Sequence, residues 1–422
     1  MTAMDEVFGS AWPVVVASTA RLTRDLDLAE DCAQEAVERA LRSWPAGPPD
    51  NPGAWLTTTA HRIALDRLRR EATLRRKFPL LVERPGEDEP EPTDPLRLVF
   101  TCCHPALALE SQVALTLRLV CGVDVGTIGA VLLTGEAGTA RRITRAKQKI
   151  AAARIPFRVP SDDELPARLD AVLTVVHLVH TAGHRGSPED PRTAELTTRA
   201  TALARVLVRL LPGEPEPRAL LGLILLTQAR GPARTDPEGD LVLLADQDRS
   251  RWDRALVREG LALTTTALQR GPHGRFALQA GVAGLHATAP TWQATDWAQV
   301  VATYDALMRV WPSPVVALNR AVARSRPADA DLAAVLREID AVAPGLAGYP
   351  YLPAARADVL ARLGRVDEAA KSWAEAVALA PNPAERRSLA RKVAQLADRG
   401  AAGDRTGGDP PLCDHVGADS QP

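Results

Sequence analysis

The segment 139–154 most strongly limits what this chain can fold into. Ile143, Ala146 and Ile150 recur at helical spacing, so one face of a helix can be buried while the opposite face meets water. The segment contains no acid. Its cations are Arg141, Arg142, Arg145, Lys147, Lys149 and Arg154. The pattern predicts an amphipathic helix whose cations face outward.

A turn precedes this basic helix. Residues 122–136 predict a short helix followed by a tight turn, because apolar residues alternate there with several glycines. A short helix, a turn and a basic helix form the arrangement in which a helix-turn-helix places its second helix in the major groove of DNA. A solvated basic helix on an ordinary helical protein explains the same residues. Both interpretations stay open on this segment alone.

Composition limits the class of protein. The 422 residues allow two to four domains, and the net charge of -1 means that any DNA contact must come from local basic patches. Ala, Leu and Arg are abundant, and no alternating apolar run is long enough for a sheet, so we expect an all-α fold. The chain lacks a secretory signal and an apolar run of transmembrane length, and its five cysteines are irregularly spaced. These features predict a cytoplasmic protein with reduced thiols that does not contact a membrane.

An acidic helix is expected near the start of the chain. Residues 5–43 predict two helices, and the second runs from about Asp25 to Arg42 with Cys32 and Ala40 on its apolar face. The opposite face is acidic and consists of Asp27, Glu30, Asp31, Gln34, Glu35 and Glu38. This face is either simply solvated or a contact surface for a basic partner helix.

A second basic helix follows a loop rich in proline and glycine. It runs from Ala54 to about Lys77, and Pro52 suits its start. Between residues 62 and 77 there are seven cations and two acids. A tryptophan at a loop-helix junction beside such a helix can stack on an unpaired base, although burial of Trp55 as a core anchor explains it equally well.

The remaining chain suggests further divisions. The stretch 78–95 holds five prolines and six acids, which predicts a flexible acidic tether. Residues 351–381 fit most of one tetratricopeptide unit, and stacked helical hairpins of this kind form a docking surface for peptides. The end of the chain is rich in Gly, Asp and Pro and is expected to be disordered. The predicted parts are 1–78, 79–95, 96–159, 160–397 and 398–422.

Signs of catalytic chemistry are absent from the sequence. The run Cys102-Cys103-His104 has no partner motif at metal-ligand spacing, so small buried residues before a helix break explain it better. A histidine row at His177, His180 and His184 lacks acidic support and fits packing better than a metal site. Without a nucleophile elbow, phosphate loop or metal cluster, we predict no enzyme, no metal and no cofactor.

The order of these segments resembles that of bacterial RNA polymerase sigma factors of the extracytoplasmic-function (ECF) type. Residues 27–36 resemble their polymerase-binding helix, residues 54–70 the helix that opens and holds the -10 promoter element, and residues 122–150 the helix-turn-helix of domain 4 that reads the -35 element. The remainder is similar to one subgroup with a long, tetratricopeptide-like C-terminal extension. Its sequence blocks are matched by 101–107, 155–160, 243–253 and 314–322.

The resemblance implies partners and sites. The 1–78 part would be sigma domain 2 and the 96–159 part domain 4, and together they would bind the β′ and β subunits of core RNA polymerase and promoter DNA. The extension would modulate activity or bind a protein or peptide. The implied residues are Asp27, Asp31, Gln34 and Glu35 for core polymerase; Trp55, Arg62, Arg67, Arg69 and Arg70 for the -10 element; and Arg141, Arg142, Arg145, Lys147 and Lys149 for the -35 element.

Two points qualify the resemblance. Thr127 stands where the family usually has a Glu. Nearby glycines, among them Gly129 and Gly138, predict a loosely folded domain 4, because each weakens a helix interior by up to about 1 kcal/mol.

The alternative function is a helix-turn-helix regulator that binds duplex DNA without polymerase and carries a solenoid sensor.

Overall fold

The computed structural model confirms the all-α prediction. It describes residues 3–44, 47–75, 91, 93–132, 134–185, 191–237, 239–271, 273–380, 385–391 and 393–394. These residues form helices and connecting turns, and their only β-type pairing is an isolated bridge between Thr235 and Leu241. Most of the predicted 79–95 tether and all of the predicted 398–422 tail lie outside the described residues.

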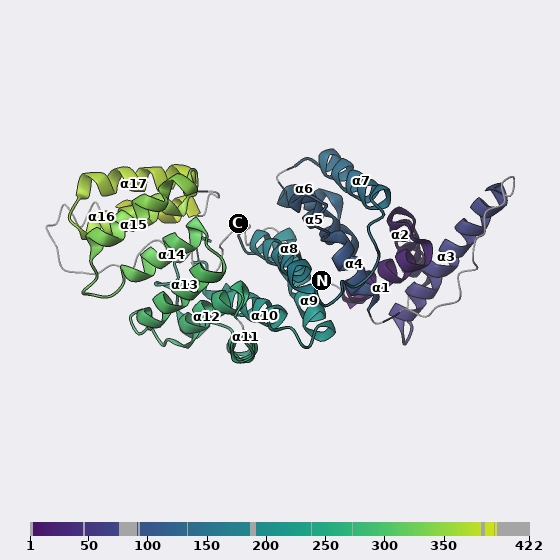
Figure 1. Ribbon diagram of the computed structural model, residues 1–422, viewed down its shortest axis with the longest axis horizontal. Helices are drawn as coiled ribbons and strands as arrows, with labels where there is room; N and C mark the ends of the chain where they lie inside the picture. The colour runs from purple at the N-terminus through teal and green to yellow at the C-terminus, as the bar shows by residue number, and fades with distance from the viewer. Residues whose placement is uncertain are drawn as a thin grey trace. The chain divides into compact units, whose positions relative to one another are not determined.

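The chain forms two compact units, whose helices are labelled in Figure 1. The first unit contains residues 1–182 and 195–210, and the second contains residues 183–194 and 211–422. The helices up to α7, with most of α8 and α9, therefore belong to the first unit. The predicted boundary at residue 160 does not coincide with the division between the units.

Three helices open the first unit. They are α1 (Ala3–Thr23), α2 (Leu26–Ser43) and α3 (Pro52–Arg75), which pack against one another. Asp25 caps α2, because its carboxylate accepts hydrogen bonds from the backbone N–H groups of Asp27 at 2.8 Å and Leu28 at 3.0 Å. The predicted helix starts and the expected apolar face of α2 are confirmed.

The next helices complete the predicted helix-turn-helix. They are α4 (Asp94–Cys102), α5 (Leu109–Leu115), the π-helical turn η1 (Thr116–Val120), α6 (Val125–Val131) and α7 (Glu136–Ala152). α4 begins inside the predicted tether, because Asp94 is fully buried and pairs with Arg21 at 3.2 Å and Arg97 at 3.0 Å. α7 packs on α5 and α6, as expected of the second helix of this motif.

The first two helices of the predicted extension lie mostly in the first unit. α8 (Leu165–Arg185) and α9 (Pro191–Leu210) follow, and Arg168 of α8 donates a hydrogen bond of 2.5 Å to the backbone carbonyl of Phe100 in α4. His177 and His180 are buried in α8, as the packing interpretation expects.

The second unit is a succession of helices. Each packs against the next along the chain from α10 onward. The helices are α10 (Pro215–Gln228), α11 (Arg254–Gln269), α12 (Arg275–Thr288), α13 (Trp297–Val310), α14 (Pro314–Arg324), α15 (Leu332–Val342), α16 (Tyr351–Arg362) and α17 (Val366–Leu379). Short turns η2 (Gly231–Ala233), η3 (Arg249–Arg251) and η4 (Ala343–Leu346) connect some of them.

The helical hairpin expected at 351–381 is present as α16 and α17. Ala354, Ala357, Trp373 and Ala376 are all buried in one apolar cluster. Gly364 forms the turn between the helices with φ of +76°, a backbone conformation that side chains disfavour. Small residues on α16 thus let α17 approach closely, which is the packing of a tetratricopeptide unit.

Replacement of Glu216 by alanine should destabilise the second unit. The Glu216 carboxylate accepts hydrogen bonds from the N–H groups of Phe276 at 2.9 Å and Ala277 at 3.0 Å, so a side chain of α10 caps the start of α12. Loss of such a cap costs about 1 kcal/mol. Urea unfolding followed by circular dichroism measures the loss. Glu214→Ala is the control because that side chain makes no cap hydrogen bond, and equal losses in both variants would contradict the role of Glu216.

Alanine substitutions at two glycines of the helix-turn-helix should have opposite effects. A β-carbon at Gly129 would lie 2.7 Å from the carbonyl oxygen of Thr134, so this glycine permits the close turn between α6 and α7. Gly129→Ala should cost about 1–3 kcal/mol through overpacking. A β-carbon at Gly138 would have open space around it, so Gly138→Ala should stabilise α7 by about 0.5–1 kcal/mol. Chemical denaturation of both variants tests this, and destabilisation by Gly138→Ala would refute it.

Candidate nucleic-acid interface

A basic hollow lies between α2 and α3. It has a volume of about 310 Å³. Its lining consists of Arg39, Arg42, Ser43, Trp55, Thr59 and Arg62. Trp55 is half-buried, and its ring meets the ring of the buried Trp44 edge to face, with centroids 5.0 Å apart. Trp44 is therefore the core anchor, and Trp55 borders the hollow.

The arginines predicted on α3 differ in their surroundings. Arg62, Arg69 and Arg70 are exposed, and Arg62 lines the hollow. Arg67 instead pairs with Glu35 of α2 at 2.8 Å and with Asp31 at 3.6 Å. Burial would raise the pKa of Glu35, but hydrogen bonds from Arg39 and Arg67 lower it below its usual value. Arg67 thus joins α3 to α2 in this structure and does not face the hollow.

Two arginines of the hollow are absent from the residues predicted by sequence. Arg39 and Arg42 lie on the last turns of α2, next to Trp44. The acidic first half of this helix dominates its pattern, so its basic end gives a weaker signal. A change from acids to cations along one helix that ends at a tryptophan is the feature that could have identified them.

The acidic face of α2 is only partly solvated. The side chain of Asp31 is 64% exposed, and Glu35 bonds to Arg39 at 2.6 Å. Glu30 was expected on the same exposed face, but its side chain is only 8% exposed. The expectation fails for Glu30 because α7 and η1 cover this part of α2.

The cations of α7 also differ in how far their side chains are exposed to solvent. Arg141, Arg145 and Lys149 are exposed, and Arg142 is partly exposed. The prediction that all cations of this helix face outward is wrong for Lys147, whose side chain is 7% exposed. Its position next to the buried Ala146 and three residues before the buried Ile150 places it at the edge of the apolar face.

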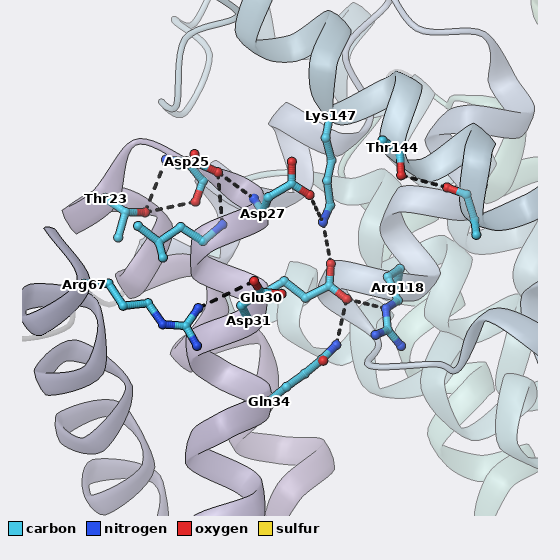
Figure 2. Close-up of polar contacts among 12 residues, drawn as sticks. Thr23, Asp25, Asp27, Glu30, Asp31, Gln34, Arg67, Arg118, Thr144 and Lys147 are labelled. Atoms are coloured by element: carbon cyan, nitrogen blue, oxygen red, sulfur yellow. Dashed lines mark hydrogen bonds and ion pairs between the residues drawn. The ribbon is translucent and has the colours of Figure 1, made fainter. Parts of the chain in front are cut away.

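Lys147 and Glu30 form the centre of an ion-pair network, shown in Figure 2. The Lys147 ammonium donates to Glu30 at 2.5 Å and to Asp27 at 2.7 Å. Arg118, which the π-helical turn η1 positions, donates to the other carboxylate oxygen of Glu30. Gln34 donates to that same oxygen at 2.9 Å. One carboxylate on α2 therefore binds groups from both η1 and α7.

The charges of this network stabilise one another. Burial alone would lower the pKa of Lys147, but the carboxylates of Glu30 and Asp27 raise it above its usual value. Lys147 is therefore charged at neutral pH. A buried ion pair of this kind contributes little net stability over an apolar pair, but removal of one partner costs about 3–5 kcal/mol. The network is a specific contact between α2 and α7.

Further contacts join the same two groups of helices. Arg21 of α1 binds the buried Asp94 of α4, and Glu91 pairs with both Arg21 and Arg97. Gly122 has φ of +70° and lies against the Trp12 ring of α1, where a β-carbon would be 3.1 Å from the ring. The helices α1–α3 and α4–α7 are thus packed together in the first unit.

Comparisons with known families agree with this architecture. Residues 11–73, which include α2 and most of α1 and α3, match the family Sigma-70 region 2. Residues 168–268, from α8 to α11, match a family of unknown function, DUF6596. No solved structure matches the chain.

Two relatives extend these matches. The chain is 39% identical over 408 residues to the uncharacterized protein R00370 of Rhizobium meliloti strain 1021, which covers 93% of this chain and 96% of that protein. It is 29% identical over 151 residues to the probable ECF RNA polymerase sigma factor SigI of Mycobacterium tuberculosis strain H37Rv. That match covers 33% of this chain and 51% of SigI.

The chain therefore contains a Sigma-70 region 2 domain and is homologous to an ECF sigma factor, a class of protein that acts in transcription initiation with core RNA polymerase and promoter DNA. It also carries a C-terminal helical extension, part of which matches DUF6596. Within the described residues, no helix has the length and apolar character needed to cross a membrane.

Proposed function

We propose that this sigma factor holds the melted -10 promoter strand in the hollow between α2 and α3. The observation that carries the proposal is the placement of a half-buried tryptophan beside three arginines, Arg39, Arg42 and Arg62. Aromatic faces stack on unpaired bases of any sequence, and arginines bind the backbone phosphates. The volume of about 310 Å³ lies at the small end of the range for ligand pockets, which suits a single nucleobase.

Core polymerase binds at the exposed start of α2 in this proposal. Asp31 offers its carboxylate to solvent, and Asp27 is also largely exposed on the same helix. A row of carboxylates is complementary to a basic helix, and such complementarity speeds association and fixes the register of a complex. Glu35 continues the row and Gln34 adds a neutral amide beside it, although both also have partners within the first unit.

The helix α7 reads the -35 element in this proposal. Arg141 and Arg145 project from the second helix of the helix-turn-helix, with Arg142 and Lys149 beside them. Such residues contact base edges and phosphates when the helix enters the major groove. The predicted contact from Lys147 requires that this side chain first leave its partners on α2.

The extension modulates these activities in cis or binds a protein or peptide. The support is its succession of packed helices, which ends in a hairpin of tetratricopeptide type formed by α16 and α17. Repeated hairpins of this kind present extended docking surfaces.

Removal of the Trp55 indole should impair promoter opening. Trp55→Ala removes the stacking surface, which is worth about 1–3 kcal/mol per base, so opening should fall about 5- to 150-fold. Trp55→Phe keeps an aromatic face and should retain most of the activity. Fluorescence of a base analogue in the -10 strand, measured with core enzyme and a cognate promoter, reports the opening. Normal opening by the alanine variant would remove the hollow from the proposal.

Charge reversal at Asp31 should weaken core binding at least tenfold, because a lysine would repel the basic helix expected on polymerase. Glu110→Lys on α5 is the matched control, since Glu110 is also exposed but lies outside the predicted contact. Co-purification and titration with labelled core enzyme measure the affinity. Gel shifts with and without core enzyme separate this function from the alternative, because a polymerase-independent regulator would bind duplex DNA tightly alone.

A further inference from the structure

The end of the second unit binds back to a loop near its beginning. Residues 385–391 are helical and lie against the loop 234–243, which follows α10. The side chain of Arg387 donates a hydrogen bond of 2.6 Å to the carboxylate of Asp240, although the two residues are 147 positions apart in the sequence. The Ser388 hydroxyl donates a further hydrogen bond of 2.8 Å to a backbone carbonyl of the same loop. The proposed function makes no use of this contact.

The carboxylate of Asp240 is matched by charges from this helical segment. Asp240 is buried; Arg387 binds one of its oxygens, and Arg391 lies 3.1 Å from the other. Arg391 also lies 3.1 Å from Asp236, and a tight turn with Gly239 at φ of +80° holds the two aspartates together. A buried carboxylate must be paired and hydrogen-bonded to offset the loss of water. The bound segment therefore stabilises the observed conformation of the loop.

The same loop continues into a segment that contacts helices from both ends of the second unit. Leu243 is packed in the apolar cluster of α14–α17, together with Leu389 of the returning segment. Trp252 is packed in a second cluster, which forms around the end of α10, the start of α11 and the turn after α12. Arg249 donates a hydrogen bond of 2.6 Å to the first backbone carbonyl after α12. Residues 234–253 thus connect the last hairpin of the unit with its first helices.

This connection differs from the packing along the rest of the unit. The main packing joins each helix to the next one or to the next but one along the chain. The stability of such an array is approximately a sum over its repeats and their nearest-neighbour interfaces, so the last hairpin could open without affecting the first helices. The contact between residues 385–391 and the loop adds an interaction between the two ends. Opening of α16 and α17 must then break the contacts of the loop as well.

We propose that residues 385–391 form a clasp that joins the two ends of the second unit into one cooperative structure. Release of the clasp leaves Asp240 without these charged partners, removes Leu389 from the cluster that holds Leu243 and so loosens residues 234–253. A protein or peptide that binds at α16 and α17 then changes α10–α12, and the reverse also holds because coupling between two sites is reciprocal. The inference rests on the proposed function only for the existence of such a binder. The clasp itself is a property of the second unit.

Hydrogen exchange of the full chain, measured by mass spectrometry, tests the clasp. Arg391→Glu places a negative charge beside Asp236 and Asp240 and should release residues 385–391. Exchange should then rise at least tenfold at both ends of the contact, in residues 234–243 and in α16 and α17, because each end loses the same partner. Arg391→Lys keeps the positive charge and should retain most of the protection.

Arg386→Glu is the matched control for this variant. It makes the same charge change on the same segment, but the Arg386 side chain donates its hydrogen bond to the Ala380 carbonyl, at 3.3 Å, and not to the loop. Both ends of the contact should stay protected in this control. Equal exchange in Arg386→Glu and Arg391→Glu, or an increase in Arg391→Glu that is confined to residues 385–391 or to one end of the contact, would overturn the proposal.

Exchange measured across a urea series tests whether the two ends open together. In the unmodified chain, α10 and the α16–α17 hairpin should lose protection at the same urea concentration, whereas in Arg391→Glu the hairpin should lose it at a lower concentration than α10. Separate transitions in the unmodified chain, or a shared transition in Arg391→Glu, would refute the cooperative closure. These measurements need neither polymerase nor DNA. Loss of the proposed function would therefore leave the clasp intact, and loss of the clasp would leave the proposed binding of polymerase and DNA by the first unit intact.

Discussion

The arrangement of helices in the first unit depends on the hydrogen bonds and ion pairs of the buried Glu30 carboxylate. A carboxylate removed from water must be matched by donors, and here the donors come from η1 and α7 as well as from α2 itself. This requirement brings the acidic helix α2 and the basic helix α7 into one register. The buried Asp94, which binds Arg21 of α1, joins the same groups of helices at a second point.

Charge complementarity can act in two ways in the first unit. Acids on α2 are suited to a basic partner, and cations on α7 are suited to DNA, so within one chain the two faces are also suited to each other. The hollow beside Trp55 lies between α2 and α3 and is separate from the residues of the ion-pair network. The hollow can therefore stay formed while α7 remains bound to α2.

Much of the fold could be predicted from sequence because helical periodicity is a local property. The starts of α2 and α3, the helix-turn-helix at α6 and α7, and the hairpin of α16 and α17 lie where the pattern of apolar, capping and turn residues placed them. Gly129 is a position whose role local propensity did not predict. By helix propensity alone, a glycine inside a short helix predicts an unstable helix. In the folded chain, Gly129 instead permits the Thr134 carbonyl to approach closely. The candidate site was partly predictable: Trp55 and Arg62 line the hollow, but Arg39 and Arg42 required the packed structure.

The sequence by itself determined an all-helical protein with two basic helices, one acidic helix and a C-terminal run of hairpins, since these follow from residue spacing along each helix. Only the tertiary structure decided which charges meet water. Glu30 and Lys147 are separated by 117 residues, and each looks like an ordinary surface residue in its own helix. Periodicity assigns a residue to a face of its helix, but it contains no information about which distant helix covers that face. Burial of these two charges therefore became visible only when α2 and α7 were placed side by side.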